Sequence, residues 1–103
     1  MSRRPGLLET EQGFLAAVVA LAKLHGWMAF HPFWSVRSTP GYPDLTLVKP
    51  PRLILAELKS ARGQLTPAQA HWLALLRQVP GIEVYEWRPC QWDEIQARLQ
   101  GRG

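Results

Sequence analysis

The stretch DLTLVKPPRLILAELK, residues 44–59, consists of two short apolar runs separated by a pair of prolines, and it predicts the centre of the fold. Proline has no backbone N–H and cannot continue a strand ladder, so each run must end at the prolines. Residues 44–48 and 53–59 therefore predict the two strands of a β-hairpin. A symmetric turn at the prolines predicts three of the cross-strand pairs: Val48–Leu53, Thr46–Leu55 and Asp44–Glu57.

Successive side chains of such a hairpin point to opposite faces. One face carries only apolar residues, and the other is apolar near the turn but has Asp44, Glu57 and Lys59 at its far end. We therefore expect both faces to be buried except at this polar corner. Directly opposed residues have Cβ atoms roughly 4.5 to 5.5 Å apart, so two carboxylates there repel unless something positive lies between them. A divalent cation would supply that charge and make the corner a functional site, whereas a cross-strand ion-pair patch with Lys59 is the structural alternative.

The remaining segments predict helices and strands around this hairpin. Thr10 and Thr66 precede apolar segments at helical spacing, as helix N-caps do, and glycine or Pro-Gly follows each segment. The expected elements are helices at 11–25, 67–78 and 93–99 and strands at 27–31, 44–48, 53–59 and 82–87. This order, α-β-β-β-α-β plus a short C-terminal helix, predicts an α/β fold with a mixed β-sheet. We expect one domain over residues 1–103, with residues 1–9 as a flexible arm.

Composition and charge narrow the class of protein. The chain has 103 residues, 47% of them hydrophobic and 19% charged, which is a globular composition and excludes a disordered or collagen-like chain. Twelve Lys and Arg against eight Asp and Glu give a net charge of +4, which favours a polyanionic partner and a basic face. Cys90 is the single cysteine, so no intramolecular disulfide forms, and it matches no zinc-ligand spacing with the three histidines.

The N-terminal part has one feature of a secretory signal. Arg3 and Arg4 precede an apolar run at residues 14–22, but Glu9, Glu11 and Gln12 interrupt the approach to it. The run is also too short to span a membrane. We therefore expect a cytoplasmic protein with no membrane partner.

Two separated motifs resemble a known enzyme family. Pro43-Asp44 followed by Glu57-Leu58-Lys59 resembles the signature of the PD-(D/E)xK nucleases. The wider pattern is similar to small stand-alone VRR-NUC domains of phages and bacteria, and it consists of Gly41-Tyr42-Pro43-Asp44-Leu45, Ala56-Glu57-Leu58-Lys59-Ser60, Gly63-Gln64-Leu65-Thr66-Pro67-Ala68-Gln69 and Trp72. The similarity covers about residues 11–99 and implies a restriction-endonuclease-like core.

This resemblance also implies roles for individual residues. Glu11, Asp44 and Glu57 would be metal ligands together with the backbone carbonyl of Leu58. Lys59 would be the catalytic lysine, and Gln69 an active-site residue on a helix. The residues agree with such chemistry, because carboxylate oxygens are hard ligands that suit Mg²⁺ or Mn²⁺.

Glu11 also stands out by its position in the sequence. Its spacing from the apolar residues of the predicted helix 11–25 places it on the core-facing side of the first turn. It could bind the same ion as Asp44 or a second one, with Glu9 as the alternative ligand.

The expected function is metal-dependent hydrolysis of DNA, with a flap or four-way junction as substrate suggested only by the family. The alternatives are an RNA nuclease and a non-catalytic nucleic-acid-binding protein with a nuclease fold. Among the loop cations Lys49, Arg52, Arg37 and Arg62, we expect Arg37 and Arg62 to contact phosphates, because their loops flank the carboxylate corner. We also expect a homodimer, because the chain is small and its five tryptophans are more than such a core readily hides.

Overall fold

A computed structural model describes residues 10–32 and 40–101 of the chain. The helices are α2 (Glu11–Leu24), α3 (Pro67–Leu76), the 3₁₀ helix η1 (Pro89–Gln91) and α4 (Trp92–Gln100). The strands are β1 (Met28–Phe30), β2 (Leu45–Lys49), β3 (Arg52–Leu58) and β4 (Glu83–Trp87). They form one mixed sheet in the order β1-β2-β3-β4, in which only β3 and β4 are parallel.

The α/β class and the mixed sheet are thus confirmed, whereas the expected order of elements is not fully met. The structure inserts η1 between β4 and the last helix, because Pro89 has the fixed φ that starts a helical turn. Helix and strand ends differ from the expected ones by one or two residues, which is the usual uncertainty at element boundaries.

The register of the hairpin is the predicted one. Val48 pairs with Leu53 and Thr46 with Leu55, and the ladder ends at Leu45 and Ala56. Asp44 therefore lies just before β2 and is not paired in the ladder. It contacts β3 through its side chain.

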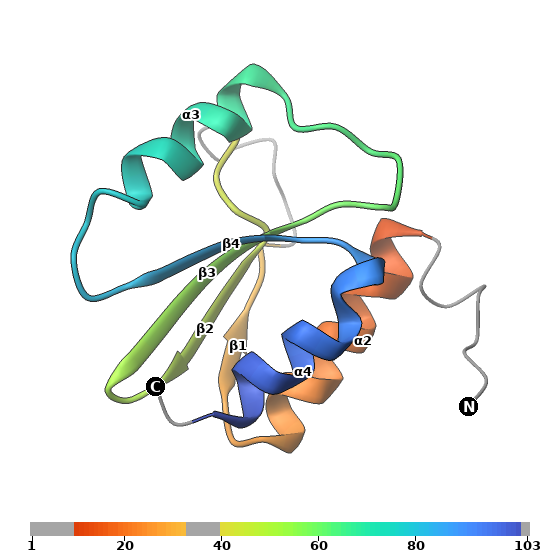
Figure 1. Cartoon of the computed structure of the whole chain (residues 1–103), viewed down its shortest axis with the longest axis vertical. Helices are drawn as coiled ribbons and strands as arrows, with labels where there is room; N and C mark the ends of the chain where they lie inside the picture. The colour runs from red at the N-terminus through yellow and green to blue at the C-terminus, as the bar shows by residue number, and fades with distance from the viewer. Residues whose placement is uncertain (1–9, 33–39, 102–103) are drawn as a thin grey trace.

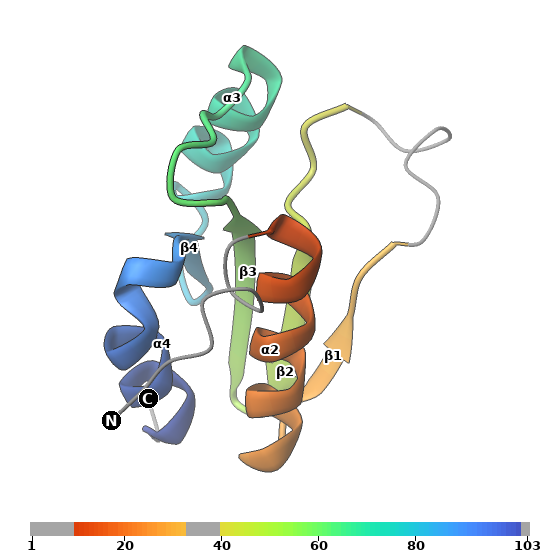
Figure 2. The same cartoon turned by 90° about the vertical axis from the view of Figure 1, so that its right-hand side faces the viewer.

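The main core lies between one face of the sheet and helices α2 and α4, which lie side by side (Figures 1 and 2). Helix α2 contributes Phe14, Val18 and Ala22 at helical spacing, all fully buried. The sheet contributes the apolar face predicted from alternation, and α4 contributes Ile95 and Leu99. Thr10 caps α2 by accepting a hydrogen bond from Gly13 N, as expected.

The second face of the sheet is less covered than expected. Helix α3 lies on this side (Figure 1), and Leu55 and Leu73 are buried. Val48, however, is 37% exposed and Leu53 is half-buried. A helix is about 10 Å wide and strands are about 4.8 Å apart, so one helix covers about two strands. The prediction that both faces are buried is therefore wrong near β1 and the hairpin turn.

Lys49 and Arg52, expected in a loop, are instead paired at the ends of β2 and β3, and both serve the fold. Lys49 Nζ donates to the carbonyl of His25. The Arg52 guanidinium forms two hydrogen bonds with Glu83, donates to the carbonyls of Arg98 and Gly101, and stacks on the Trp27 ring. Lys49 thus ties β2 to the end of α2, and Arg52 ties β3 to β4 and to the C-terminal segment, so neither is a free phosphate contact.

The described tryptophans do not form the exposed surface that suggested a dimer. Trp27 and Trp87 are buried, and Trp72 and Trp92 are partly buried. Trp34 lies outside the described residues. Among residues 10–32 and 40–101, no helix has the length and apolar character needed to cross a bilayer. The single cysteine, Cys90, is exposed and forms no disulfide within the described structure.

Candidate functional site

The structure brings Asp44, Glu57 and Lys59 together at the end of the hairpin away from the turn. Asp44 Oδ2 accepts a hydrogen bond of 3.0 Å from the backbone N–H of Leu58. Lys59 Nζ lies 3.9 Å from Glu57 Oε2. Glu57 is 1% exposed and Lys59 is 8% exposed, so two ionisable side chains are removed from water here. Buried charges need partners, which explains why the three groups gather at one corner.

The carboxyl group of Glu57 has an unusual environment. Burial, and then the nearby negative charge of Asp44, raise the pKa of Glu57 to about 8, although Lys59 acts in the opposite direction. Glu57 Oε2 accepts a hydrogen bond of 2.9 Å from Gln69 Nε2. In the described part of the chain, Glu57 Oε1 is buried and has no hydrogen-bond partner. A carboxylate oxygen of this kind fits a metal ion, since a hard cation would take its free lone pairs.

Gln69 reaches Glu57 because of the way α3 begins. Thr66 Oγ1 accepts from Gln69 N, and Gln69 Oε1 accepts from Thr66 N, which together form a capping box. The amide oxygen is used in the cap, so the amide nitrogen points to Glu57. The helix start thus holds Gln69, an active-site residue according to the family resemblance, beside Glu57.

The segment before Asp44 is fixed against α3. Gly41 has φ +91°, and a Cβ on it would lie 2.5 Å from the backbone carbon of Ala68. Trp72 Nε1 donates to the carbonyl of Pro40 at 3.0 Å, and its ring meets Tyr42 edge to face at 5.1 Å. This connection joins the Asp44 side of the site to the Gln69 side. Sequence reasoning missed the role of Trp72, although its position on the α3 turn after Gln69 marked it.

Glu11 lies at the rim of the site, where the helix side that its spacing marked meets Lys59. Its side chain is 50% exposed, and Oε2 is 4.0 Å from Lys59 Nζ. With Asp44 and Leu58 it lines a cleft of about 310 Å³. A charged group in the first turn can remain at the edge of the core, where water still reaches it.

The three expected carboxylate ligands are arranged as a close pair and a single residue. Among the described residues, no three His, Cys, Asp or Glu side chains are close enough to hold one ion. Asp44 and Glu57 form the close pair, and Glu11 is joined to them through Lys59.

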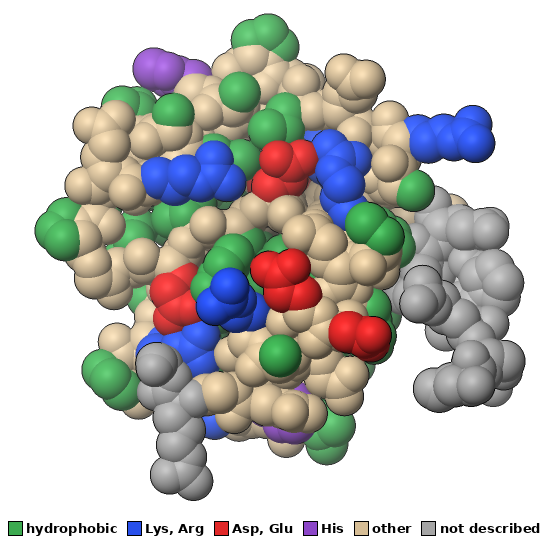
Figure 3. Space-filling view, in the orientation of Figure 1, with side chains coloured by type: hydrophobic (Ala, Val, Ile, Leu, Met, Phe, Trp, Pro, Cys, Tyr) green, Lys and Arg blue, Asp and Glu red, His purple; other side chains and the backbone are tan. Residues whose placement is uncertain are grey.

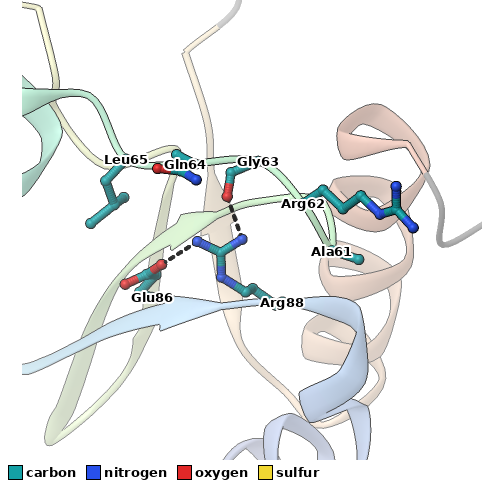
Figure 4. Close-up of a pocket in the computed structure, with 7 residues that line it drawn as sticks. All are labelled: Ala61, Arg62, Gly63, Gln64, Leu65, Glu86 and Arg88. Carbon is teal, nitrogen blue, oxygen red and sulfur yellow. Dashed lines mark hydrogen bonds and ion pairs between the residues drawn. The ribbon is translucent and has the colours of Figure 1, made fainter.

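Of the two arginines expected to contact phosphates, Arg62 lies within the described residues and Arg37 does not. Arg62 is exposed on the loop after Lys59, and Figure 4 shows its side chain pointing away from Arg88 and Glu86. Arg37 lies outside the described residues, as do Glu9 and the predicted arm at 1–9. The face in Figure 3 has basic and acidic side chains interspersed, so the expected basic face is not found on this side.

No family model, curated protein or solved structure matches this chain. The resemblance to nucleases therefore rests on the sequence motifs of this chain.

Proposed function

We propose that this protein is a metal-dependent nuclease of the PD-(D/E)xK type, a single VRR-NUC-like domain with a restriction-endonuclease-like core, which hydrolyses phosphodiester bonds in DNA. The observation that supports it best is the buried Glu57 carboxyl group, whose Oε1 lacks a partner within the described structure while Asp44 and Lys59 stand beside it. A free buried oxygen is what a metal ligand would leave in the absence of its ion.

Asp44 and Glu57 would hold Mg²⁺ or Mn²⁺, with the Leu58 carbonyl as a further oxygen ligand. When bound, such an ion lowers the pKa of a coordinated water and neutralises charge on the reacting phosphate. Asp44 is oriented by the Leu58 N–H, and Glu57 is oriented by Gln69. The Lys59 ammonium, between Glu57 and Glu11, is placed to contact the scissile phosphate and orient the attacking water.

DNA is the proposed partner because the net charge is +4 and Arg62 is exposed next to the site. Preference for a flap or four-way junction, and a cytoplasmic location, remain proposals from the sequence.

We also propose a homodimer. Support comes from three exposed apolar residues on one face of the sheet edge: Met28, Phe30 and Val48. Met28 pairs with Val48 across β1 and β2, which places their side chains together.

The deciding experiment is a cleavage assay on plasmid, flap and four-way junction DNA and on RNA, each with Mg²⁺, Mn²⁺ or EDTA. We expect metal-dependent DNA cleavage by the parent and none by Lys59→Met. Lys23→Met, an exposed substitution in the last turn of α2, is the control and should retain activity. Cleavage of RNA alone would indicate an RNA nuclease, and binding without cleavage would indicate a non-catalytic protein. A parent that neither cleaves nor binds nucleic acid would refute the proposal.

A further inference from the structure

The end of strand β4 and the residue after it carry the sequence Glu86-Trp87-Arg88. This acid-x-base pattern lies directly beside Glu57-Leu58-Lys59 of the candidate site. Glu86 pairs with Glu57 and Trp87 pairs with Leu58 in parallel register. Lys59 N then donates to the Trp87 carbonyl at 3.0 Å, which continues the ladder toward Arg88. Because side chains alternate along a strand, Glu86 and Arg88 lie on the same face as Glu57 and Lys59, one strand away.

The Arg88 guanidinium joins this second pair to the loop that follows Lys59. Its Nη2 lies 2.6 Å from Glu86 Oε2. Its Nη1 donates to the carbonyl of Ser60 at 2.8 Å and to that of Gly63 at 2.5 Å, as Figure 4 shows for Gly63. One side chain thus holds both ends of the turn at residues 60–63. The turn itself is closed by Gly63 N, which donates to Ser60 O and Ser60 Oγ.

This turn lies against the groups of the proposed active site. A Cβ built on Gly63 would be 3.2 Å from Glu11 Oε2 and 3.5 Å from Lys59 Cδ. The backbone at Gly63 therefore packs against the stem of Lys59 and the carboxylate of Glu11. Any movement of the turn would change the space in which the Lys59 ammonium sits between Glu57 and Glu11.

We propose that Arg88, oriented by Glu86, is a positioning residue of the nuclease: it fixes the turn at residues 60–63 and thereby the place of the Lys59 ammonium. This inference rests on the proposed function. Arginine suits the task because its planar group offers several donors in fixed directions, whereas a lysine ammonium is a single point on a flexible stem. The carbonyls of Ser60 and Gly63 accept from Nη1 and the carboxylate of Glu86 accepts from Nη2, so two nitrogens of one rigid group serve all three acceptors.

The test compares Arg88→Gln, Arg88→Lys and Glu86→Gln with the parent. Arg77→Gln, an exposed arginine at the end of α3, is the control. Steady-state cleavage of the best DNA substrate in Mn²⁺ gives kcat and KM. Hydrogen exchange of the amides at 61–64, compared with those of β3, reports the turn without depending on activity.

We expect Arg88→Gln and Arg88→Lys to lower kcat about 10- to 100-fold, as loss of an outer-shell partner typically does. The KM for DNA should change much less, because no phosphate contact is removed. The 61–64 amides should exchange faster while β3 keeps its protection. Glu86→Gln leaves the two carbonyl bonds in place, so its loss of kcat should be smaller, and Arg77→Gln should match the parent.

Unchanged exchange at 61–64 in Arg88→Gln would overturn the role of Arg88 in holding the turn. Faster exchange with the kcat of the parent would overturn its positioning role. The Arg88 variants could also lose hydrogen-exchange protection of the β3 amides. In that case Glu86→Gln is the deciding variant: the inference stands if its kcat falls while the β3 amides stay protected, and fails if its kcat equals that of the parent. A parent inactive with every substrate and metal would refute the proposed function and the positioning role, while the exchange data would still decide whether Arg88 holds the turn.

Discussion

Glu57 differs from an ordinary glutamate because its surroundings oppose its charge. Its pKa is about 8 in the folded protein, against an ordinary value of 4.5, owing to burial and to Asp44. At pH values between 4.5 and about 8, the folded protein therefore binds more protons than the unfolded chain. Stability must fall as the pH rises through this range in EDTA, since ionisation of Glu57 costs more in the folded state.

Glu57→Gln should remove this pH dependence. The amide carries no charge to bury, so the metal-free variant should be more stable than the parent near pH 8 and lose the downward trend from pH 5 to 8. Urea unfolding in EDTA at several pH values measures this. Parallel stability curves for parent and variant would show that Glu57 does not titrate in this way.

The Asp44 side chain allows the metal site to be separated from an ion-pair patch. Asp44→Asn keeps an oxygen that can accept from Leu58 N and removes the charge beside Glu57. We expect cleavage to be lost and the metal-free protein to be as stable as the parent or slightly more stable, by about 0 to 1 kcal/mol. Mg²⁺ or Mn²⁺ should raise the Tm of the parent and have much less effect on the variant, because a ligand stabilises the form that binds it.

Melting curves with EDTA and with millimolar metal distinguish the two interpretations. If Asp44→Asn is destabilised and the Tm of the parent does not change with metal, the assignment of a metal site to Asp44 is wrong.

Among the elements, the close contact between the 40–43 segment and α3 controls how the two sides of the site meet. Gly41 and Gly81 both have positive φ, but only Gly41 faces a neighbour, since a Cβ at Gly81 meets nothing within 4 Å. Alanine at either site costs about 1 to 2 kcal/mol for the backbone conformation. Gly41→Ala should cost about 1 to 3 kcal/mol more, because the added carbon overlaps the Ala68 backbone.

Chemical denaturation of the two glycine variants provides a matched comparison. Gly41→Ala should also reduce cleavage, because it separates Asp44 from α3 and Gln69. Equal losses of stability would mean that the approach of the 40–43 segment to α3 is not tight.

At the scale of the whole molecule, charge governs the encounter with DNA. If Arg62 contacts a phosphate, binding in Ca²⁺ should weaken linearly on a log–log plot against salt, and Arg62→Ala should reduce the slope by about one. Arg77→Ala is the control and should leave the slope unchanged. Fluorescence anisotropy with labelled duplex DNA measures both, and an unaltered slope for Arg62→Ala would remove Arg62 from the interface.

The exposed edge of the sheet leads to a prediction about assembly. Met28 is 75% exposed and Phe30 is 63% exposed on strand β1, which is an edge strand. We expect light scattering at micromolar concentration to give twice the monomer mass, and Phe30→Asp to shift the protein to monomer. Leu75→Asp, on the exposed side of α3, is the control. A monomeric parent would reject the homodimer.

The sequence by itself determined the features that depend on neighbours along the chain. The prolines fix the hairpin turn, and the period of two then fixes its register, so the sequence alone places Asp44 near Glu57. The starts of α2 and α3 follow from Thr10 and Thr66, whose caps act within one turn of the helix.

Only the tertiary structure decided the features that depend on which distant segments meet. Parallel pairing of β3 with β4 brings Glu86 and Arg88 beside Glu57 and Lys59, and no local pattern specifies that register. The spacing of Glu11 placed it on the core-facing side of the first turn, but only the packing of α2 shows that it stands at the rim beside Lys59. Burial of Glu57 arises from α3 and the strands on either side, so its altered pKa could not be derived from its neighbours in sequence. Local geometry is set by covalent connectivity and alternation, whereas burial and long-range contacts are set by how the helices pack on the sheet.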